Sequence, residues 1–224
     1  MQFSVIVPLL NEKEQITSLL EHLQNLKVQE GCEVIVVDGG STDGSVEILE
    51  QSGLQLVHAT RGRAVQMNAG ALMAKGQWLV FLHADSRLPA DALKSITNLE
   101  KENAHWGRFN IQIVGSSFWF PLIASLVNFR SRFSGIATGD QAIFVRRGLF
   151  EAIGGFPAQP LMEDIELSRR LRSYYWPYCS REKVETSGRR WEKYGVLRTI
   201  LLMWRLRFDY WRGVSAESLA KRYE

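Results

Sequence analysis

The sequence predicts an α/β protein whose mostly parallel sheet is flanked by helices, and three observations lead to this prediction. Short apolar runs alternate with helical patterns through the first hundred or so residues, as they do in βαβ units with right-handed crossovers. The runs are continuous and rich in β-branched residues, which is typical of strands covered on both faces. The chain has 224 residues, 46% hydrophobic and 23% charged, so it can bury a sizeable core.

The strands are predicted from apolar runs bounded by turn residues. These runs lie at residues 3–8, 33–37, 54–58, 78–82, 105–114 and 141–146. The first four alternate regularly with helices, whereas the later elements are more mixed. We therefore expect the parallel part of the sheet to come from the first half of the chain.

The helices are predicted from apolar residues at helical spacing. Asn11 is expected to cap the first helix, which Gly31 closes, and the second helix begins at Asp43 or Ser45. The remaining helices are predicted over residues 63–74, 118–133, 162–172 and 197–211, and from Pro89 towards Lys101.

Charge and the N-terminal segment restrict the function classes. The formal net charge is only +3, which is too mild to indicate a nucleic-acid partner, and the sequence shows no basic–aromatic repeat or zinc-finger spacing. The first residues lack the pattern of a signal peptide, and no apolar run reaches the about 20 residues of a spanning helix. We therefore expect a cytoplasmic protein, with peripheral contact at the inner face of a membrane as an alternative.

An acidic, glycine-containing stretch follows the strand predicted at residues 33–37. Asp38 comes directly after the apolar run, and Gly40 and Asp43 follow it. Ligands of open α/β sheets bind beyond the carboxyl ends of the strands, and glycine lets a ligand approach the backbone closely. We expect Asp38 to hold a base and Asp43 to face a ribose or an arginine. A strand-to-helix turn capped by Asp43 is the alternative.

A second acidic stretch, His83-Ala84-Asp85, follows the strand predicted at residues 78–82. Asp85 is the candidate ligand for Mg²⁺ or Mn²⁺, because hard cations take oxygen ligands and diphosphate oxygens can fill the other positions. His83 is a weaker candidate, since a lone histidine beside apolar residues commonly sits in the core. With Asp38, these residues indicate a nucleotide-diphosphate donor, beside which Ala84 would lie.

Further polar residues are expected around the donor. Pro8 and Glu12 follow the first strand, where Glu12 suits a nucleotide but also suits the first turn of a helix. Arg61 and Arg63 can contact phosphate through their planar guanidinium groups. Asn68, within the same helix, can turn its amide towards the ligand.

Three segments of the second half carry the candidate catalytic and acceptor residues. Glu163 and Asp164 open a helix, where a carboxylate can accept the proton of an attacking hydroxyl. From spacing alone, the stronger interpretation is a pair of acids that is stabilised at a helix N-terminus by the helix dipole. Two further segments have expected roles. An acceptor pocket is expected at Gly139, Asp140 and Gln141, and binding of the diphosphate is expected at Arg189, Arg190 and Trp191.

In this order and spacing, the motifs resemble the inverting family 2 glycosyltransferases with the GT-A fold. The matching segments are residues 5–8 with 11–12, 38–43, 68–70, 81–85, 154–156 and 163–164. The stretches at 61–68, 139–141 and 187–191 look closest to a small bacterial branch described as selenodomain-associated transferases. The resemblance implies a GT-A catalytic domain over residues 1–190 and a C-terminal helical appendage over residues 191–224.

The resemblance also implies residue roles. Glu12, Asp38 and Asp43 would bind the nucleotide, and Asp85 would hold the Mg²⁺ or Mn²⁺ ion on the donor diphosphate. Asp164 would be the general base of a single displacement that inverts the anomeric carbon, with Glu163 orienting it. Two alternatives remain: a nucleotidyltransferase, which lacks support because residues 8–12 contain no glycine, and a non-catalytic module that binds a nucleotide sugar or a lipid carrier.

The partners are less defined than the donor. The acceptor is expected to be a small molecule or a lipid-linked one. The helix predicted at residues 197–211 mixes aromatic, leucine and arginine residues, which suits a membrane interface. The same pattern suits packing on the core or on a second subunit of a homodimer, with the arginines reaching solvent.

Overall fold

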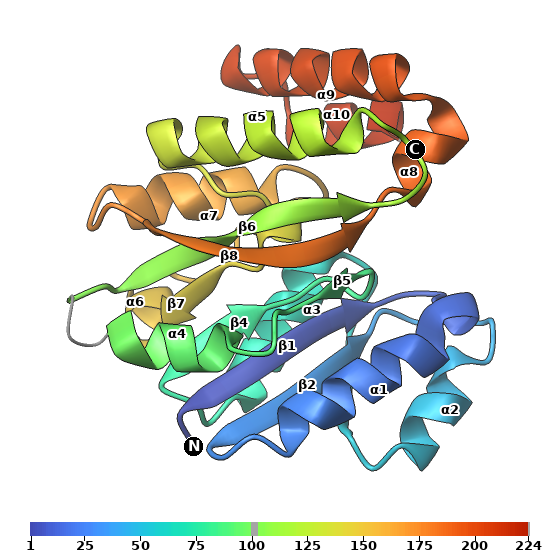
Figure 1. Ribbon diagram of the computed structural model, residues 1–224, viewed down its shortest axis with the longest axis vertical. Helices are drawn as coiled ribbons and strands as arrows, with labels where there is room; N and C mark the ends of the chain where they lie inside the picture. Colours follow the sequence, from blue (N-terminus) through green and yellow to red (C-terminus); the bar gives the residue numbers. More distant parts are fainter. Residues whose placement is uncertain (100–102, 224) are drawn as a thin grey trace.

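The computed structural model describes residues 1–99 and 103–223, and this part of the chain forms one mixed eight-stranded sheet covered by helices (Figure 1). The strands run in the order β3-β2-β1-β4-β7-β6-β8-β5. Their bounds are β1 Phe3–Leu9, β2 Cys32–Asp38, β3 Gln55–His58, β4 Trp78–Phe81, β5 Ser86–Arg87, β6 Trp106–Val114, β7 Phe144–Arg146 and β8 Tyr178–Ser187.

The first four strands are parallel, as predicted. β1 pairs with β2 on one side and with β4 on the other. In this register Asp38 lies opposite Leu9, at the carboxyl end of β2, and Asp85 follows β4. Because β1, β2 and β4 are parallel, their carboxyl ends lie at the same edge of the sheet, and these two acids therefore lie at that edge with β1 between them.

The second half of the sheet is mixed. β7 runs antiparallel to both β4 and β6, whereas β8 runs parallel to β6 and also pairs with the short β5. The strand β8 was not predicted, because Val184 is the only buried aliphatic residue in this strand and its neighbours are polar and charged. This strand pairs Ser187 with the segment at Asp85 through the hydrogen bond from Ser187 N to Asp85 O, at 3.2 Å.

Helices cover both faces of the sheet. Their bounds are α1 Ile16–Lys27, α2 Ser45–Gln51, α3 Arg63–Met73, α4 Ala92–Asn98, α5 Phe120–Ser134, α6 Arg147–Ala152, α7 Glu163–Arg172, α8 Arg189–Tyr194, α9 Val196–Trp211 and α10 Ala216–Tyr223. Alternate residues of the strands point to opposite faces. On β1, Val5 and Val7 therefore pack with α1 and α4, whereas Ile6 packs with α3, α6 and α7.

The C-terminal helices pack on the rest of the molecule through one side only. Ile200 of α9 joins a cluster around Ile123 of α5, and Leu206 packs with Leu161 and Leu219. Figure 1 shows α5 and α9 as neighbouring helices at one end of the molecule, with α10 behind them. Within the described residues, no helix combines the length and apolar character that crossing a membrane requires.

Some local predictions were wrong. Asn11 caps no helix in the described chain: it adopts a left-handed conformation, and its side-chain oxygen accepts the N–H of Thr42 at 2.8 Å. A 3-10 turn over Lys13–Gln15 precedes α1. The segment predicted as a strand from residue 141 begins with the 3-10 turn η3, Gly139–Gln141, and β7 starts only at Phe144. Lys101, the predicted end of α4, lies outside the described residues.

Candidate functional site

A cavity of about 610 Å³ lies where α5, α7 and α9 meet the segments after β4 and at the end of β8. Its polar lining combines acids with arginines, and the rest of the lining is mainly aliphatic and aromatic. The charged lining residues are Asp85, Asp140, Asp164, Arg63, Arg130, Arg190 and Arg207. Carboxylates and guanidinium groups gathered in one cleft suit a ligand that carries both phosphate and a reacting hydroxyl.

The turn η3 positions Asp164 against His83. The backbone N–H of Gly139 donates to Asp164 Oδ2 at 2.8 Å. A Cβ built at Gly139 would lie 2.3 Å from His83 Cε1 and Nε2, so only glycine permits this approach. Burial and the nearby Arg63 lower the pKa of His83, which leaves its imidazole neutral at pH 7. The turn therefore holds Asp164 and His83 in one fixed arrangement.

Glu163 and Arg63 form an ion pair beside this turn. Arg63 Nε lies 2.9 Å from Glu163 Oε1, and the Glu163 side chain is buried. Burial and the neighbouring Asp164 raise the pKa of Glu163 to about 7, against the opposing effect of Arg63. Glu163 raises the pKa of Arg63 in return, and burial opposes it. Glu163 thus holds Arg63 at the edge of the cavity.

Several polar atoms around the cavity are buried and unpaired within the described residues. In the described chain, His83 Nε2, Asp140 Oδ1, Glu163 Oε2 and two nitrogens of Arg130 are buried without a hydrogen-bond partner. Buried polar groups are normally hydrogen-bonded. Their concentration at one cavity therefore indicates that water or a ligand completes the site.

The residues present fit a divalent cation that a donor diphosphate would share. Asp85 offers carboxylate oxygens, and His83 Nε2 is a neutral nitrogen with no hydrogen-bond partner among the described residues. Within residues 1–99 and 103–223 there is no group of three or more histidine, cysteine or acidic side chains arranged to hold a metal ion. A cation such as Mg²⁺ that takes most of its oxygens from substrate phosphates needs only one or two protein ligands.

The segment after β2 forms a compact acceptor-rich loop. Asp38 is buried and accepts hydrogen bonds from the N–H groups of Gly40 and Ser41. Burial alone would raise the pKa of Asp38, but these hydrogen bonds outweigh it and lower the pKa. Asp43 accepts from Lys13 N and Ser45 N. The loop is therefore preorganised at the same edge of the sheet as Asp85.

A long-range ion pair connects this loop region with the C-terminal part. Arg189 Nη2 lies 3.1 Å from Glu12 Oε2. Arg190, next to it, lines the cavity, donates to the backbone oxygen of Tyr223 and stacks over the Tyr223 ring at 3.7 Å. Trp191 lines the same cavity. Glu12 and Arg189, two predicted site residues that are 177 positions apart in the sequence, thus meet at one end of the sheet.

Some predicted site residues have structural roles in this fold. The Asn68 amide donates to Phe156 O and accepts from Phe156 N, at 2.9 and 3.0 Å. Gln141 is fully buried, and its side-chain oxygen accepts the N–H of Thr138. Both amides therefore point into the protein. Ala84 and Pro8 are buried at strand ends, and Arg61 lies in the exposed loop before α3.

Sequence reasoning missed three residues. Arg130 of α5 and Arg207 of α9 line the cavity, and burial together with repulsion from Arg207 lowers the pKa of Arg130 to about 10. The signal for Arg130 was a cation that follows the apolar first half of its helix. The buried Gln66 donates to both Leu9 O and Val37 O at 2.8 Å, which ties the ends of β1 and β2 together below the Asp38 loop.

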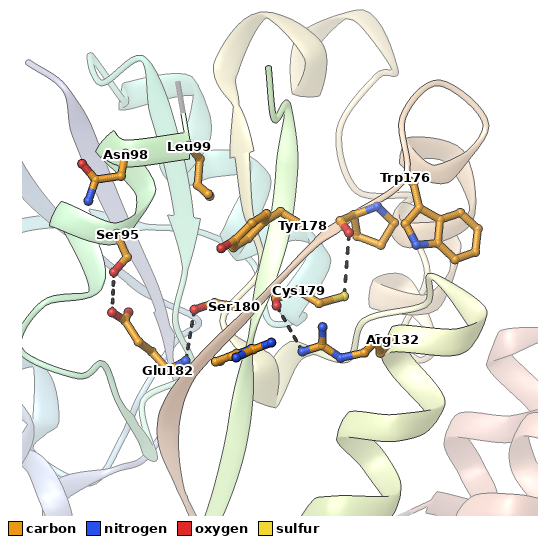
Figure 2. Close-up of a pocket in the computed structure, with 11 residues that line it drawn as sticks. Ser95, Asn98, Leu99, Arg132, Trp176, Tyr178, Cys179, Ser180 and Glu182 are labelled. Atoms are coloured by element: carbon orange, nitrogen blue, oxygen red, sulfur yellow. Dashed lines mark hydrogen bonds between the residues drawn. The ribbon is translucent and has the colours of Figure 1, made fainter. Parts of the chain in front are cut away.

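A second cavity of about 540 Å³ lies at the start of β8 (Figure 2). Figure 2 shows Ser95 hydrogen-bonded to Glu182, and Arg132 donating to the backbone oxygen of Cys179. Its lining comes from α4, α5 and the first half of β8. Three of the predicted carboxylates, Asp85, Asp140 and Asp164, line the other cavity, which is therefore the candidate site.

The sequence is similar to known glycosyltransferases. The chain is 30% identical over 175 residues to the PGL/p-HBAD biosynthesis glycosyltransferase of Mycobacterium tuberculosis, covering 69% of this chain and 62% of that protein. It is 26% identical, over an alignment 242 positions long, to the beta-monoglucosyldiacylglycerol synthase of a Nostoc species, and the alignment covers 93% of this chain and 50% of that protein. The chain thus spans about half to two thirds of the length of these two relatives, and less of others.

Solved structures share the fold at lower identity. Staphylococcus aureus TarS, solved with UDP-GlcNAc, gives a TM-score of 0.66 at 20% identity over 84% of this chain and 58% of that one. A mannosyltransferase of Pyrobaculum calidifontis, solved with GDP-Man and Mn²⁺, gives 0.64 at 22% identity over 82% and 56%. The α/β fold of the GT-A type expected from the sequence is therefore confirmed. The family model for glycosyl transferase family 2 matches residues 4–153, and the chain belongs to that family.

Proposed function

We propose that this protein transfers a sugar from a nucleotide-diphosphate sugar to a hydroxyl acceptor by a single displacement with inversion. The observation that carries the proposal is the cavity that Asp164 and Asp85 line together with several arginines. Relatives that are glycosyltransferases, and solved neighbours that hold UDP-GlcNAc or GDP-Man, support the donor class. The identity of the sugar and of the nucleobase is left to the experiment below.

The nucleoside end of the donor would bind at the loop after β2. Asp38, which is buried, and Asp43 are both fixed by backbone N–H groups, so the loop would bind a nucleoside at low reorganisation cost. Glu12 and Arg189 border the same edge as an ion pair. The diphosphate would then lie across the end of β1, towards Asp85.

The diphosphate end would be held by cations of the chain. Arg63 and Arg190 line the cavity, and each presents a fork of N–H donors that matches phosphate oxygens. Asp85, with His83 as the weaker second ligand, would hold Mg²⁺ or Mn²⁺, which when bound neutralises charge on the departing diphosphate. Glu163 would act by holding Arg63 in place.

Asp164 would accept the proton of the attacking hydroxyl. The Gly139 N–H donates to its Oδ2 at 2.8 Å and the Ile165 N–H donates to its Oδ1 at 2.7 Å. Both oxygens are thereby fixed, and each keeps a second lone pair that can accept the proton of the acceptor hydroxyl. Attack on the anomeric carbon from the face opposite the diphosphate breaks the bond to that phosphate oxygen, forms the new glycosidic bond and inverts the carbon. Asp140, with a buried oxygen that lacks a partner among the described residues, would orient the acceptor.

The experiment is a thermal-shift panel of nucleotide diphosphates and nucleotide sugars, with and without Mn²⁺. A donor present at 100 times its dissociation constant adds about 2.7 kcal/mol to the apparent stability. Product assays with the donor found in the panel then compare wild type with Asp164→Asn and with Asp91→Asn, a change at the exposed first turn before α4.

Three outcomes separate the candidate functions. Donor binding retained in Asp164→Asn with turnover lost, and both retained in Asp91→Asn, is the expected result. Pyrophosphate release from nucleoside triphosphates would identify a nucleotidyltransferase instead. Turnover undetectable in wild type despite tight donor binding would identify a binding module.

The proposal also includes a place in the selenodomain-associated branch and a cytoplasmic location. Both rest on the sequence alone.

A further inference from the structure

The outer sides of α5 and α9 carry exposed apolar stripes. On α5 the residues recur every three or four positions, and on α9 they do the same. They are Leu122, Leu126, Phe129 and Phe133 on α5, and Leu197, Leu201, Trp204, Phe208 and Trp211 on α9. Contiguous apolar surface of this kind on a folded protein indicates a partner or a lipid surface. We call these stripes the α5–α9 face.

The charge beside the stripes favours a lipid surface over a protein surface. Arg198 and Arg205 of α9 and Arg212, the residue that caps it, are exposed and repeat at seven-residue spacing, so they lie together on one flank of the apolar stripe. Asp209, on the same helix, is paired with Arg222 at 2.8 Å. An amphipathic helix with tryptophan and leucine on one side and arginine beside them is typical of binding to anionic bilayers.

The candidate site opens between the two stripes. Leu126, Phe129 and Trp204 are exposed members of the α5–α9 face and also line the cavity. The cavity then continues along apolar side chains to the carboxylate of Asp164. A ligand that enters by this route therefore meets an apolar channel before it reaches the polar end.

Two arginines lie at the polar end near these helices, with Asp140 and Asp164 in the same lining. Arg130 of α5 and Arg207 of α9 line the cavity close enough to interact with each other. Two guanidinium nitrogens of Arg130 are buried without a hydrogen-bond partner in the described chain. An anionic group beside them would satisfy these donors, because phosphate accepts several guanidinium hydrogen bonds.

We propose that the α5–α9 face docks on an anionic lipid surface, and that an amphiphilic acceptor enters the cavity from that surface with its anionic end near Arg130 and Arg207. The docking stands on the surface itself, whereas the acceptor class rests on the proposed transferase function. A second copy of this chain is the competing occupant of the same face.

Docking is tested by sedimentation of the full chain with vesicles. Vesicles of phosphatidylcholine mixed with phosphatidylglycerol should bind the protein at least about tenfold more tightly than phosphatidylcholine alone, and salt should weaken the binding. The variant Phe133→Ser, Leu201→Ser, Trp211→Ser removes three exposed side chains outside the cavity lining. Its affinity for the mixed vesicles should fall about tenfold or more.

Two controls match these changes. Val28, directly after α1, and Leu72, on α3, are exposed at 82% and 87%, so Val28→Ser, Leu72→Ser should leave vesicle binding unchanged. The reversals Arg198→Glu, Arg205→Glu should abolish the preference for phosphatidylglycerol, whereas Lys94→Glu on α4 should retain it. Far-ultraviolet circular dichroism and the melting temperature show that each variant is folded.

The amphiphile is tested with dodecyl phosphate below its micelle concentration. It should raise the melting temperature of wild type more than inorganic phosphate or dodecanol does, and Leu126→Ser should reduce that shift. Equal shifts with inorganic phosphate, or a shift unaffected by Leu126→Ser, overturn the proposed acceptor class.

The docking proposal is overturned by vesicle binding that is absent, or that survives in the triple-serine variant. It is also overturned by light scattering that shows a dimer dependent on Phe133, Leu201 and Trp211. Donor binding is measured separately, without vesicles. Loss of docking with donor binding intact refutes this inference alone, whereas docking without any donor binding refutes the proposed function.

Discussion

The backbone N–H of Gly139 lies 2.8 Å from Asp164 Oδ2, while the same residue leaves no room for a side chain beside His83. One glycine thus fixes the proposed base and the histidine of the proposed metal site together. The η3 turn is itself held by a capping box between Thr138 and Gln141.

Replacement of Gly139 by alanine is expected to impair chemistry more than donor binding. The new Cβ must displace His83 or the turn, and a shift of about 1 Å at a reacting group costs on the order of 100-fold in rate. Steady-state kinetics with the donor of the thermal-shift panel should show the loss in kcat. Gly148→Ala, where a Cβ has open space, is the matched control. A change in KM alone would contradict the assignment.

Replacement of Glu163 by glutamine is expected to alter the pH dependence of stability. The folded pKa of Glu163 is raised to about 7 from 4.5, so the folded state binds more protons between these values. Wild type should therefore lose stability as pH rises from about 4.5 to 7, by at most about 3 kcal/mol. Urea unfolding at a series of pH values should give a flatter profile for Glu163→Gln. Identical slopes would refute the raised pKa.

Replacement of Asp38 by asparagine is expected to weaken both folding and donor binding. The carboxylate accepts hydrogen bonds from the N–H groups of Gly40 and Ser41, and its loss should cost about 1–3 kcal/mol. Because the folded pKa is lowered, this contribution is present above the unfolded value and disappears as pH falls through the folded value. Denaturation at pH 7 and at acid pH measures it. Equal losses at both pH values would be inconsistent with this assignment.

Replacement of Asn68 by alanine is expected to destabilise the protein and leave donor affinity nearly unchanged. Its amide spends both functions on the backbone of Phe156, so the loss should be about 1–3 kcal/mol of folding free energy. Urea unfolding and donor titration are compared in the same preparation. A tenfold loss of donor affinity at unchanged stability would place Asn68 in the donor site after all.

Replacement of Asp85 by asparagine is expected to uncouple donor binding from the metal ion. The thermal shift by the donor should depend on Mn²⁺ in wild type and lose that dependence in the variant, because asparagine is a poorer ligand for a hard cation. Chelation should then reduce the wild-type shift to that of the variant. Asp91→Asn controls for the loss of one negative charge. A metal effect that persists in Asp85→Asn would exclude Asp85 as a ligand.

Local sequence patterns predicted the first half of the fold. The parallel strands and α1 to α3 follow from apolar runs and helical spacing, because each of these elements buries its own periodic face. The acids that follow β2 and β4 were visible for the same reason, since a carboxylate directly after a buried strand marks its carboxyl end. The roles proposed for Asp38, Asp85 and Asp164 remain predictions.

The rest of the fold depends on pairing between residues that are far apart in the sequence. The strand β8 has a single buried aliphatic residue, Val184, and it is a strand because β6 and β5 supply its hydrogen bonds. The amides of Asn68 and Gln141 resemble ligand-binding groups in sequence, yet they bind backbone of this chain. A residue's hydrogen-bond partner is set by what the fold brings beside it, and spacing along the chain does not encode that.

The sequence by itself determined the α/β alternation, the acidic strand ends and the amphipathic character of α9, because these depend on neighbours within a few residues. Only the tertiary structure decided that Arg63, Arg130 and Arg207 line the cavity with Asp164, and that both apolar stripes border its opening. The physical reason is that a cavity is made by side chains from distant segments, whose meeting depends on the packing of the whole sheet.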